Sequence, residues 1–385
     1  MTSALEIVFW LSCALIVWTQ VGYALALALI ARLSGRGRAP RRREAADDPP
    51  SLSLIVAAHD EQAVIAAKLA NALSLDYPRE RLELVVACDG CTDATAALAR
   101  EAGADVVVEL PRGGKIRAQD AAVERSRGEI VAFSDANATW EPGAARALVA
   151  AFADPRVGYA CGQVRFVQAA GGAEASNQEG VYWRYELRVR ELESRLSSIT
   201  AGNGAIYATR RESYLVVDPI MGHDLSLPFN LVKRGWRAVY VPGARAREKM
   251  VPSLGGEFAR KRRMMSHTWP ILLRGGMLSP RGYPPGYAMM IVSHRLLRYA
   301  TPGLHLIALA TNVALLALGA GPLYAVTLAL QLALLGAAAL GGALPARPLL
   351  IARYYVLTTA SPAAGLWDWL RHGTSAAWEA AEGTR

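Results

Sequence analysis

The chain contains 385 residues with a formal net charge of +9 at pH 7, and 52% of its residues are hydrophobic. This length allows one large domain with attachments, and so high an apolar content argues against a wholly soluble enzyme. The apolar residues are concentrated at the two ends of the chain. The net positive charge suits a protein that lies on an anionic lipid leaflet.

The first apolar run covers residues 4–31 and contains one acidic residue, Glu6. It is long enough to cross the ~30 Å hydrocarbon layer of a membrane. A cleaved signal peptide is the weaker interpretation, because no basic residue precedes the run and the run is too long. Six arginines follow at once: Arg32, Arg36, Arg38, Arg41, Arg42 and Arg43. The positive-inside rule therefore places the following chain in the cytoplasm; a nucleic-acid-binding arm is disfavoured because the tract adjoins the span and lacks aromatic residues.

Two further apolar runs, at 301–318 and 323–341, are separated only by residues 319–322 and should form a tight helical hairpin. A third stretch at 349–367 contains an arginine and a proline. Its hydropathy leaves open whether it spans the membrane, re-enters it or lies at its surface.

Between the apolar ends, strand and helix patterns alternate, which is typical of a parallel sheet covered by helices. Expected strands lie at 52–57, 84–88, 106–108 and 130–134, and expected helices at 62–74, 92–102 and 115–126. After about residue 155 the pattern becomes mixed, with strands at 157–164, 205–208 and 238–241 and helices at 179–196 and 224–234. Basic and apolar residues then alternate over 253–272, as in a helix lying in the membrane interface.

These patterns predict an α/β domain with a mixed sheet, flanked by transmembrane and interfacial helices. The expected segments are a transmembrane helix at 1–32, a basic cytoplasmic linker at 33–50, the α/β domain at 51–250, amphipathic interfacial helices at 251–298, transmembrane segments at 299–370 and a tail at 371–385.

Two expected strands end in acidic residues, Asp89 and Asp135. Ligands of open α/β sheets bind beyond the carboxyl ends of the strands. Asp89 could accept a hydrogen bond from a nucleotide base, or it could cap a turn. Asp135 is the candidate ligand of Mg²⁺ or Mn²⁺, which prefer oxygen donors, and Asn137 offers a neutral oxygen beside it. Lys115 begins an expected helix and either faces the nucleotide or lies at the surface.

Another group of polar residues follows later in the chain. Asp224, at the start of an expected helix, is either a helix cap or a general base aimed at an acceptor hydroxyl. His223 either tunes Asp224 or faces solvent. Arg260 and Arg263 belong to a run of four cations that could hold a diphosphate, although not all four can reach one phosphate group.

Cys88 and Cys91 have a C-x-x-C spacing, but no second pair or histidine completes a zinc site. We expect Cys88 to pack at a strand end and Cys91 to lie in a turn. Asp93, which follows in the same turn, is expected to cap the next helix.

In their order and spacing, these residues resemble the motifs of the family 2 inverting glycosyltransferases with a GT-A fold. The resemblance covers roughly residues 50–270, and the flanking apolar runs are similar to the membrane-embedded branch that includes hyaluronan, chitin and cellulose synthases. Asp135-Ala136-Asn137 resembles the D-x-D motif with its last carboxylate lost. Glu61 stands in the position of the acidic residue in the first loop of the family, and Asp89 in that of the first nucleotide-binding aspartate.

The resemblance also implies roles on the acceptor side. Gly202-Asn203-Gly204 is similar to the acceptor-side glycine turn, and His223-Asp224 to the pair whose second member is the catalytic base. The Q-x-x-R-W motif of the family is altered here to Arg260-Lys261-Arg262-Arg263-Met264. Replacement of its tryptophan by Met264 argues against long-chain processivity.

The resemblance therefore implies a multi-pass protein of the inner (plasma) membrane with its catalytic domain in the cytoplasm. It would use Mg²⁺ or Mn²⁺ to transfer a sugar from a UDP-sugar to a lipid-linked or glycan acceptor, forming a β-linkage. It would contact membrane lipids and no nucleic acid. Two alternatives remain: a processive polysaccharide synthase that translocates its polymer, and a non-catalytic subunit that binds nucleotide-sugars.

Overall fold

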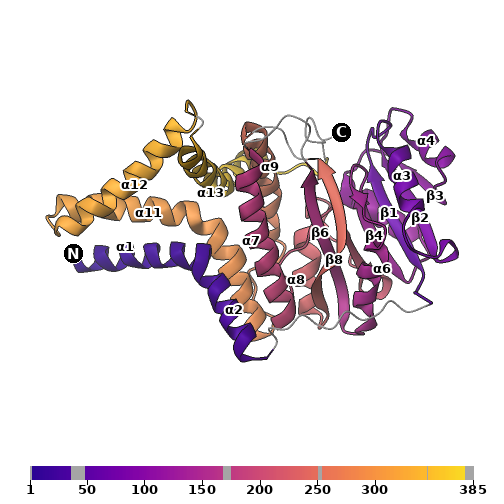
Figure 1. Cartoon of the computed structure of the whole chain (residues 1–385), viewed down its shortest axis with the longest axis horizontal. Helices are drawn as coiled ribbons and strands as arrows, with labels where there is room; N and C mark the ends of the chain where they lie inside the picture. The colour runs from indigo at the N-terminus through magenta and orange to yellow at the C-terminus, as the bar shows by residue number, and fades with distance from the viewer. Residues whose placement is uncertain (1, 36–47, 168–174, 250–253, 345, 378–385) are drawn as a thin grey trace.

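The computed structural model describes residues 2–35, 48–167, 175–249, 254–344 and 346–377. An α/β domain forms one end of the molecule, and long apolar helices form the other (Figure 1). Most of the predicted basic linker lies outside the described residues, as does the end of the predicted tail.

The described part of the domain contains one eight-stranded sheet in the order β3-β2-β1-β4-β7-β6-β8-β5. The strands are β1 (Leu52–Ala58), β2 (Leu82–Asp89), β3 (Val106–Leu110), β4 (Ile130–Asp135), β5 (Thr139–Trp140), β6 (Val157–Val167), β7 (Tyr207–Arg210) and β8 (Arg237–Lys249). β3, β2, β1 and β4 are parallel, whereas β7 is antiparallel to β4 and β6, and β5 to β8. The mixed sheet is therefore confirmed.

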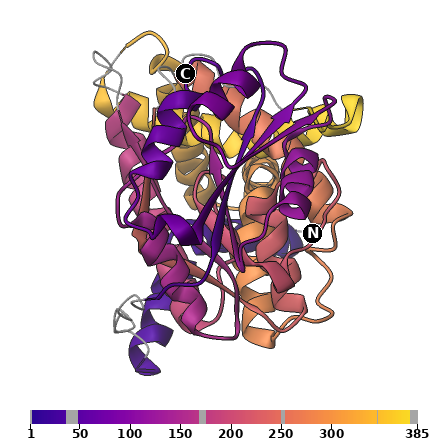
Figure 2. The same cartoon turned by 90° about the vertical axis from the view of Figure 1, so that its right-hand side faces the viewer.

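Helices cover both faces of this twisted sheet (Figure 2). They are α3 (Ile65–Leu73), α4 (Thr95–Glu101), α5 (Lys115–Arg125), α6 (Ala144–Val149), α7 (Ala175–Leu196) and α8 (His223–Lys233). Successive strand residues serve opposite faces: Leu54 and Val56 pack in the core with α3, α4 and α6, and Ile55 packs in the core with α5, α7 and α8. This alternation accounts for the almost continuous apolar runs of the central strands.

The second of these cores continues into the apolar helices. The N-terminal helix consists of α1 (Thr2–Val17), a π-turn (Trp18–Gly22) and α2 (Tyr23–Leu33), and it bends at the π-turn (Figure 1). α1 packs beside α11 (Leu297–Ala317), and α2 beside α7 of the domain. Tyr23 and Leu27 of α2 belong to the same buried cluster as the sheet, so the domain and the N-terminal helix share one core.

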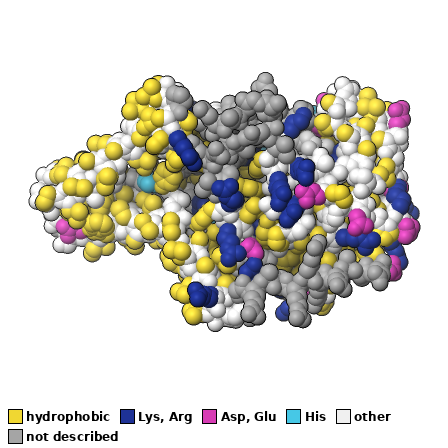
Figure 3. Space-filling model, viewed as in Figure 1, with side chains coloured by type: hydrophobic (Ala, Val, Ile, Leu, Met, Phe, Trp, Pro, Cys, Tyr) yellow, Lys and Arg dark blue, Asp and Glu magenta, His cyan; other side chains and the backbone are white. Residues whose placement is uncertain are grey.

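Three helices in the described part of the chain are long and apolar enough to cross a membrane: Thr2–Leu33, Pro285–Ala317 and Pro322–Leu340. Figure 3 shows apolar side chains over the end of the molecule that is formed by these long helices. The third, α12, follows α11 after a short turn, as the sequence predicts. α13 (Arg347–His372), which contains the undecided stretch at 349–367, is not among the candidates and packs against α9 (Leu254–Leu273).

The helix before α11 differs from expectation. α10 (Pro285–Met290) runs through a π-turn (Ile291–Leu296) directly into α11, so no break separates the expected interfacial segment from the expected span at 298. A π-turn inserts a residue without ending the helix. The polar residues of the π-turn, Ser293, His294 and Arg295, are buried.

Buried ionic contacts join this π-turn to the domain. Glu193 on α7 is fully buried and accepts hydrogen bonds from the Tyr23 hydroxyl, at 2.7 Å, and from the backbone amide of Thr200, at 3.1 Å; its Oε1 lies 2.7 Å from His294 Nδ1. Two turns earlier on α7, Glu186 contacts Arg298 at the start of α11. Removing one member of such a group leaves its partners buried without compensation.

We expect Glu193→Ala to destabilise the protein by about 3–5 kcal/mol, because three buried polar groups lose their acceptor. The apparent midpoint of thermal unfolding in detergent would show this loss. Glu191→Ala is the matched control on the same helix. Its half-buried carboxylate pairs with Arg188 and Arg195, and such pairs contribute less than about 1 kcal/mol. Equal midpoints for the two variants would contradict the assigned importance of Glu193.

Candidate active site

A cavity of about 910 Å³ opens at the carboxyl end of β4. The structure brings most of the predicted site residues together around it: Lys115, Asp135, Asn137, Gly202, Asn203, Gly204, His223, Asp224, Arg260, Arg263 and Met264. They come from loops and helices more than a hundred residues apart in the chain. Glu61 and Asp89 are buried but do not belong to the residues that line the cavity.

Asp135 stands at the end of β4 and forms an ion pair with Lys115, the first residue of α5. Burial alone would lower the pKa of the Lys115 ammonium, but the Asp135 carboxylate outweighs it and the pKa is raised. Gly204 leaves room beside this pair. A Cβ at Gly204 would lie 3.4 Å from Lys115 Nζ and 4.0 Å from Asp135 Oδ2.

Glu248 on β8 lines the same cavity and was not predicted from the sequence. Burial and the negative charge of Asp135 raise the pKa of this carboxyl to about 7. Beneath the loop that follows β4, the buried Lys68 ammonium donates a hydrogen bond to Ala138 O at 2.7 Å. Its pKa is lowered to about 7, chiefly by burial. The end of β4 thus lies among several carboxylates and ammonium groups.

The Gly202-Asn203-Gly204 turn fixes the position of Asp224. The backbone amide of Gly202 donates a hydrogen bond to Asp224 O at 2.6 Å. A side chain at Gly202 is excluded, because a Cβ would lie 2.0 Å from the hydroxyl of buried Tyr159. Asn203 holds the turn from inside, donating to Gly162 O at 2.7 Å and accepting from the Ile206 amide at 2.9 Å.

His223 lies beneath Asp224 and is buried, so it does not face solvent. Its Nδ1 lies 2.9 Å from the Tyr207 hydroxyl. Burial, and then the nearby Lys115 ammonium, lower the pKa of His223 to about 3. The imidazole is therefore neutral at physiological pH and cannot act there as a cationic acid.

Asp89 organises the loop in front of α5. Its carboxylate accepts hydrogen bonds from the amide of Gly113 at 2.6 Å and from that of Gly114 at 2.9 Å. These bonds leave Lys115 at the start of α5, where it meets Asp135. In this structure Asp89 therefore caps the turn before α5, which is one of the two roles that the sequence left open for it.

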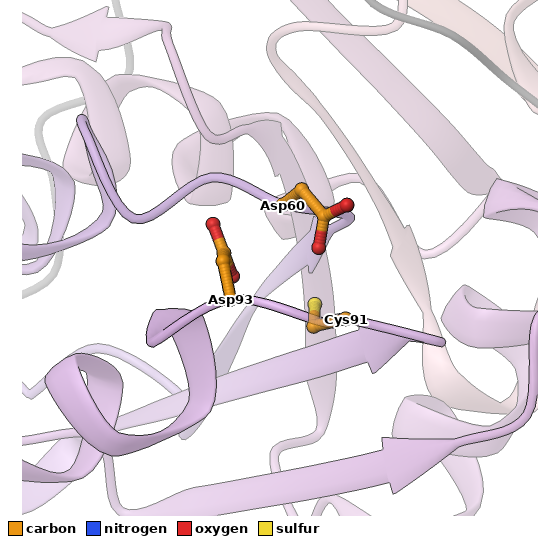
Figure 4. A group of neighbouring side chains, drawn as sticks. All are labelled: Asp60, Cys91 and Asp93. Atoms are coloured by element: carbon orange, nitrogen blue, oxygen red, sulfur yellow. The ribbon is translucent and has the colours of Figure 1, made fainter.

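A second acidic group lies nearby: ligand atoms of Asp60, Cys91 and Asp93 are within 4.8 Å of one another (Figure 4). Both carboxylates are engaged by the backbone. Asp60 accepts from the Thr92 amide at 2.7 Å, and Asp93 accepts from the Thr95 amide at 2.9 Å, as expected of a cap. The group therefore joins two loops. Cys88 is buried at the end of β2, as predicted.

The four cations of α9 do not all line the cavity. Arg260, Lys261 and Arg263 line the cavity. Arg262 turns away and forms an ion pair with Asp368 of α13, with its Nε 2.6 Å from the carboxylate. The indole of Trp269 donates to Pro362 O at 2.8 Å and provides a second link between the two helices.

The cavity does not end at the α/β domain. It extends past α9 to residues of α11 and α13 and to the π-turn of the N-terminal helix: Gln20, Tyr299, Thr301, Tyr354, Tyr355, Thr358 and Ser361. These side chains are aromatic or carry hydroxyl or amide groups. One continuous space therefore connects the charged end of β4 with helices of the apolar end.

Several known proteins are similar in sequence to this chain. Residues 49–266 match a family model described as glycosyltransferase like family 2. The probable glycosyltransferase YdaM of Bacillus subtilis is 30% identical over 140 residues, which are 34% of this chain and 33% of that protein. The beta-monoglucosyldiacylglycerol synthase of Synechocystis is 30% identical over 174 residues, 41% of this chain and 35% of that protein.

An N-acetylglucosaminyltransferase of Rhizobium leguminosarum is 26% identical over 230 residues, 55% of this chain and 54% of that protein. The chain thus matches between a third and about half of the length of these relatives. Among solved structures, the mannosyltransferase PcManGT from Pyrobaculum calidifontis, in complex with GDP-Man and Mn²⁺, is 23% identical. The structural match covers 94% of this chain and 99% of the PcManGT chain, with a TM-score of 0.68.

This likeness to PcManGT extends over the α/β domain and the apolar helices and confirms the expected GT-A fold. The family model covers more than half of the 385 residues. The chain belongs to glycosyltransferase family 2.

Proposed function

We propose that the protein is a membrane-bound inverting glycosyltransferase. It transfers a sugar from a UDP-sugar to a lipid-linked acceptor at the cytoplasmic face of the inner membrane. The observation that carries this proposal is the single cavity that holds Asp135 and Asp224 at one end and reaches the apolar helices at the other. In this assignment residues 51–250 are the catalytic domain, and the three long apolar helices are its membrane anchor.

Asp224 is the proposed general base. Its backbone is tied to the glycine turn and its side chain lines the cavity, whereas the neighbouring histidine is buried and its lowered pKa makes it a weak base. The Asp224 carboxylate takes the proton of the acceptor hydroxyl, whose oxygen attacks the anomeric carbon from the face opposite the nucleotide. A single displacement of this kind inverts the configuration and yields a β-linkage from an α-linked donor.

Asp135, with Asn137 beside it, is the proposed metal position. The donors are hard oxygens, as Mg²⁺ and Mn²⁺ require, and the missing side chain at Gly204 leaves space for a diphosphate next to Asp135. A divalent cation bound there would offset the charge of the departing diphosphate. Lys115, Arg260 and Arg263 add positive charge from the walls of the cavity. The Mn²⁺ named with PcManGT is consistent with this assignment.

The acceptor is proposed to come from the membrane. The cavity reaches α11 and α13, where hydroxyl and aromatic side chains suit the headgroup of an amphiphile. The name of the Synechocystis relative describes a glycolipid product, which agrees with this proposal. The few candidate spans and Met264 favour addition of a single sugar over synthesis of a translocated polymer.

Asp224→Asn should lower the rate of sugar transfer by about 10²–10⁴-fold, because the amide cannot accept the acceptor proton. Binding of UDP, measured by calorimetry, should remain. Asp218→Asn is the control: this aspartate is exposed, does not line the cavity and should transfer normally. Near-normal transfer by Asp224→Asn would exclude it as the base.

Removal of divalent cations with EDTA should abolish transfer, and Mn²⁺ or Mg²⁺ should restore it, because the cation offsets the diphosphate charge. Released UDP provides the measurement. The variant Asp135→Ala should not recover when the cation is added back. Full activity in EDTA would mean that cationic side chains alone neutralise the leaving group.

Thr358→Trp should obstruct the membrane end of the cavity. The indole would occupy space that the acceptor needs, so transfer to a total bacterial lipid extract should fall by about tenfold or more, which corresponds to about 1.4 kcal/mol. Hydrolysis of the donor by water should be unchanged. Leu370→Trp is the control on the same helix, because Leu370 is 68% exposed and lies outside the cavity.

Mass spectrometry of the lipid product should find one added sugar; a polymer ladder would contradict single addition.

A further inference from the structure

The D-x-D motif of this chain provides one carboxylate where the motif ordinarily has two. Asp135 keeps its charge, whereas Asn137 can offer only a neutral amide oxygen. A divalent cation that bridges a diphosphate is usually held by one or two carboxylates of the protein. With Asp135 already paired to Lys115, the remaining negative charge of the motif is weak for a 2+ ion. The structure offers a second carboxylate nearby.

The pairing of β5 with β8 brings Glu248 to the motif. Thr139 of β5 lies opposite Arg247, and Trp140 lies opposite Ala246. One further step along this antiparallel register brings Ala138 opposite Glu248. Because the amide of Ala138 donates to Asp135 O at 3.2 Å, the turn that carries the motif ends beside Glu248. The sequence alone does not show this proximity, because Ala138 and Glu248 are more than a hundred residues apart in the chain.

The backbone at Glu248 is held by a second strand as well. β6 pairs with β8 in parallel, and Phe166 lies opposite Glu248 in that register. The Glu248 side chain lines the cavity together with Asp135 and Asn137. A ligand carried by a strand that is paired on both edges is rigid, which favours precise placement of a cation. In addition, two carboxylates that face the same space repel each other, and a bound divalent cation removes that repulsion.

We propose that Glu248 supplies the carboxylate that the motif lacks at Asn137, so that Asp135 and Glu248 together hold the divalent cation of the donor site. This inference rests on the proposed function, because it assumes that the cavity binds a metal with the nucleotide. The competing role for Glu248 is that of a counter-charge to the cations of the cavity wall, among them Lys115 and Arg260. The two roles predict different results when the carboxylate is moved from position 248 to position 137. A metal ligand can be replaced in this way, whereas a counter-charge to the cavity wall cannot.

The test measures Mn²⁺ binding to the purified full-length protein in detergent. Free Mn²⁺ is followed by electron paramagnetic resonance, with and without UDP and with no acceptor present. Glu248→Gln should weaken Mn²⁺ binding by at least about tenfold, since even groups that only support metal ligands contribute 10–100-fold. Glu248→Gln combined with Asn137→Asp should recover most of the affinity, because a carboxylate returns to the same space.

Glu141→Gln is the matched control. Glu141 follows β5 directly and pairs with Arg247, which is the neighbour of Glu248. It does not line the cavity and should leave Mn²⁺ binding unchanged. The thermal unfolding midpoint of each variant shows whether the fold is retained.

The outcomes distinguish a failure of the proposed metal dependence from a failure of the assignment of Glu248 as a ligand. If the wild-type protein binds no Mn²⁺ in the presence of UDP, the proposed metal dependence itself fails. If it binds and Glu248→Gln binds equally well, Glu248 is not a ligand. If Glu248→Gln binds weakly and Asn137→Asp restores nothing in a folded double variant, Glu248 acts as a counter-charge, and the inference is overturned.

Discussion

The charge of Asp135 is the constraint around which the rest of the cavity is arranged. This carboxylate stands at the end of β4, a central strand whose other side chains are fully or almost fully buried. A buried or half-buried charge needs compensation, and the fold supplies it from three directions. Lys115 comes from the start of α5, Lys68 reaches the loop from below, and cations of α9 approach from the side of the apolar helices. In the proposed function, the same charge that is compensated in the free protein holds the divalent cation of the donor site.

The glycine turns decide how closely these elements approach. Gly202 packs against the Tyr159 hydroxyl and donates to the backbone of Asp224, so the proposed base cannot move independently of the sheet. Gly114 is equally constrained: its φ is +95°, and a Cβ there would lie 2.0 Å from Ala376 O. A positive φ favours glycine, and the close contact excludes any larger residue. Close contacts at Gly202, to a side chain, and at Gly114, to the backbone, therefore exclude larger residues at both positions.

Much of the fold follows from local pattern. The central strands were predictable because their apolar runs are short and end in polar turns, and Asp135 and Asp224 because they follow such a run or begin a helix. Two features were not predictable. β8 extends beyond Pro242 and Gly243, which read locally as a loop, because β6 and β5 pair with its second half. Asp89 has its hydrogen bonds to the loop before α5, a tertiary contact that its own neighbourhood in the sequence does not contain.

Tertiary contacts, which local hydropathy does not contain, also explain why the position of α13 was left open by the sequence. The same contacts place α13 beside the cavity. Its arginine and proline read as defects in a membrane span, yet Pro362 O accepts the hydrogen bond of Trp269, and Asp368 pairs with Arg262. The segment after α13 then continues to the glycine turn at Gly114, with the Thr374 hydroxyl donating to Ser266 O at 2.9 Å on the way. α13 and the residues that follow it therefore contact the cavity both among the apolar helices and beside the loop that Asp89 holds. These polar links tie α13 to α9, so its proline and its acidic residue contribute to packing between helices.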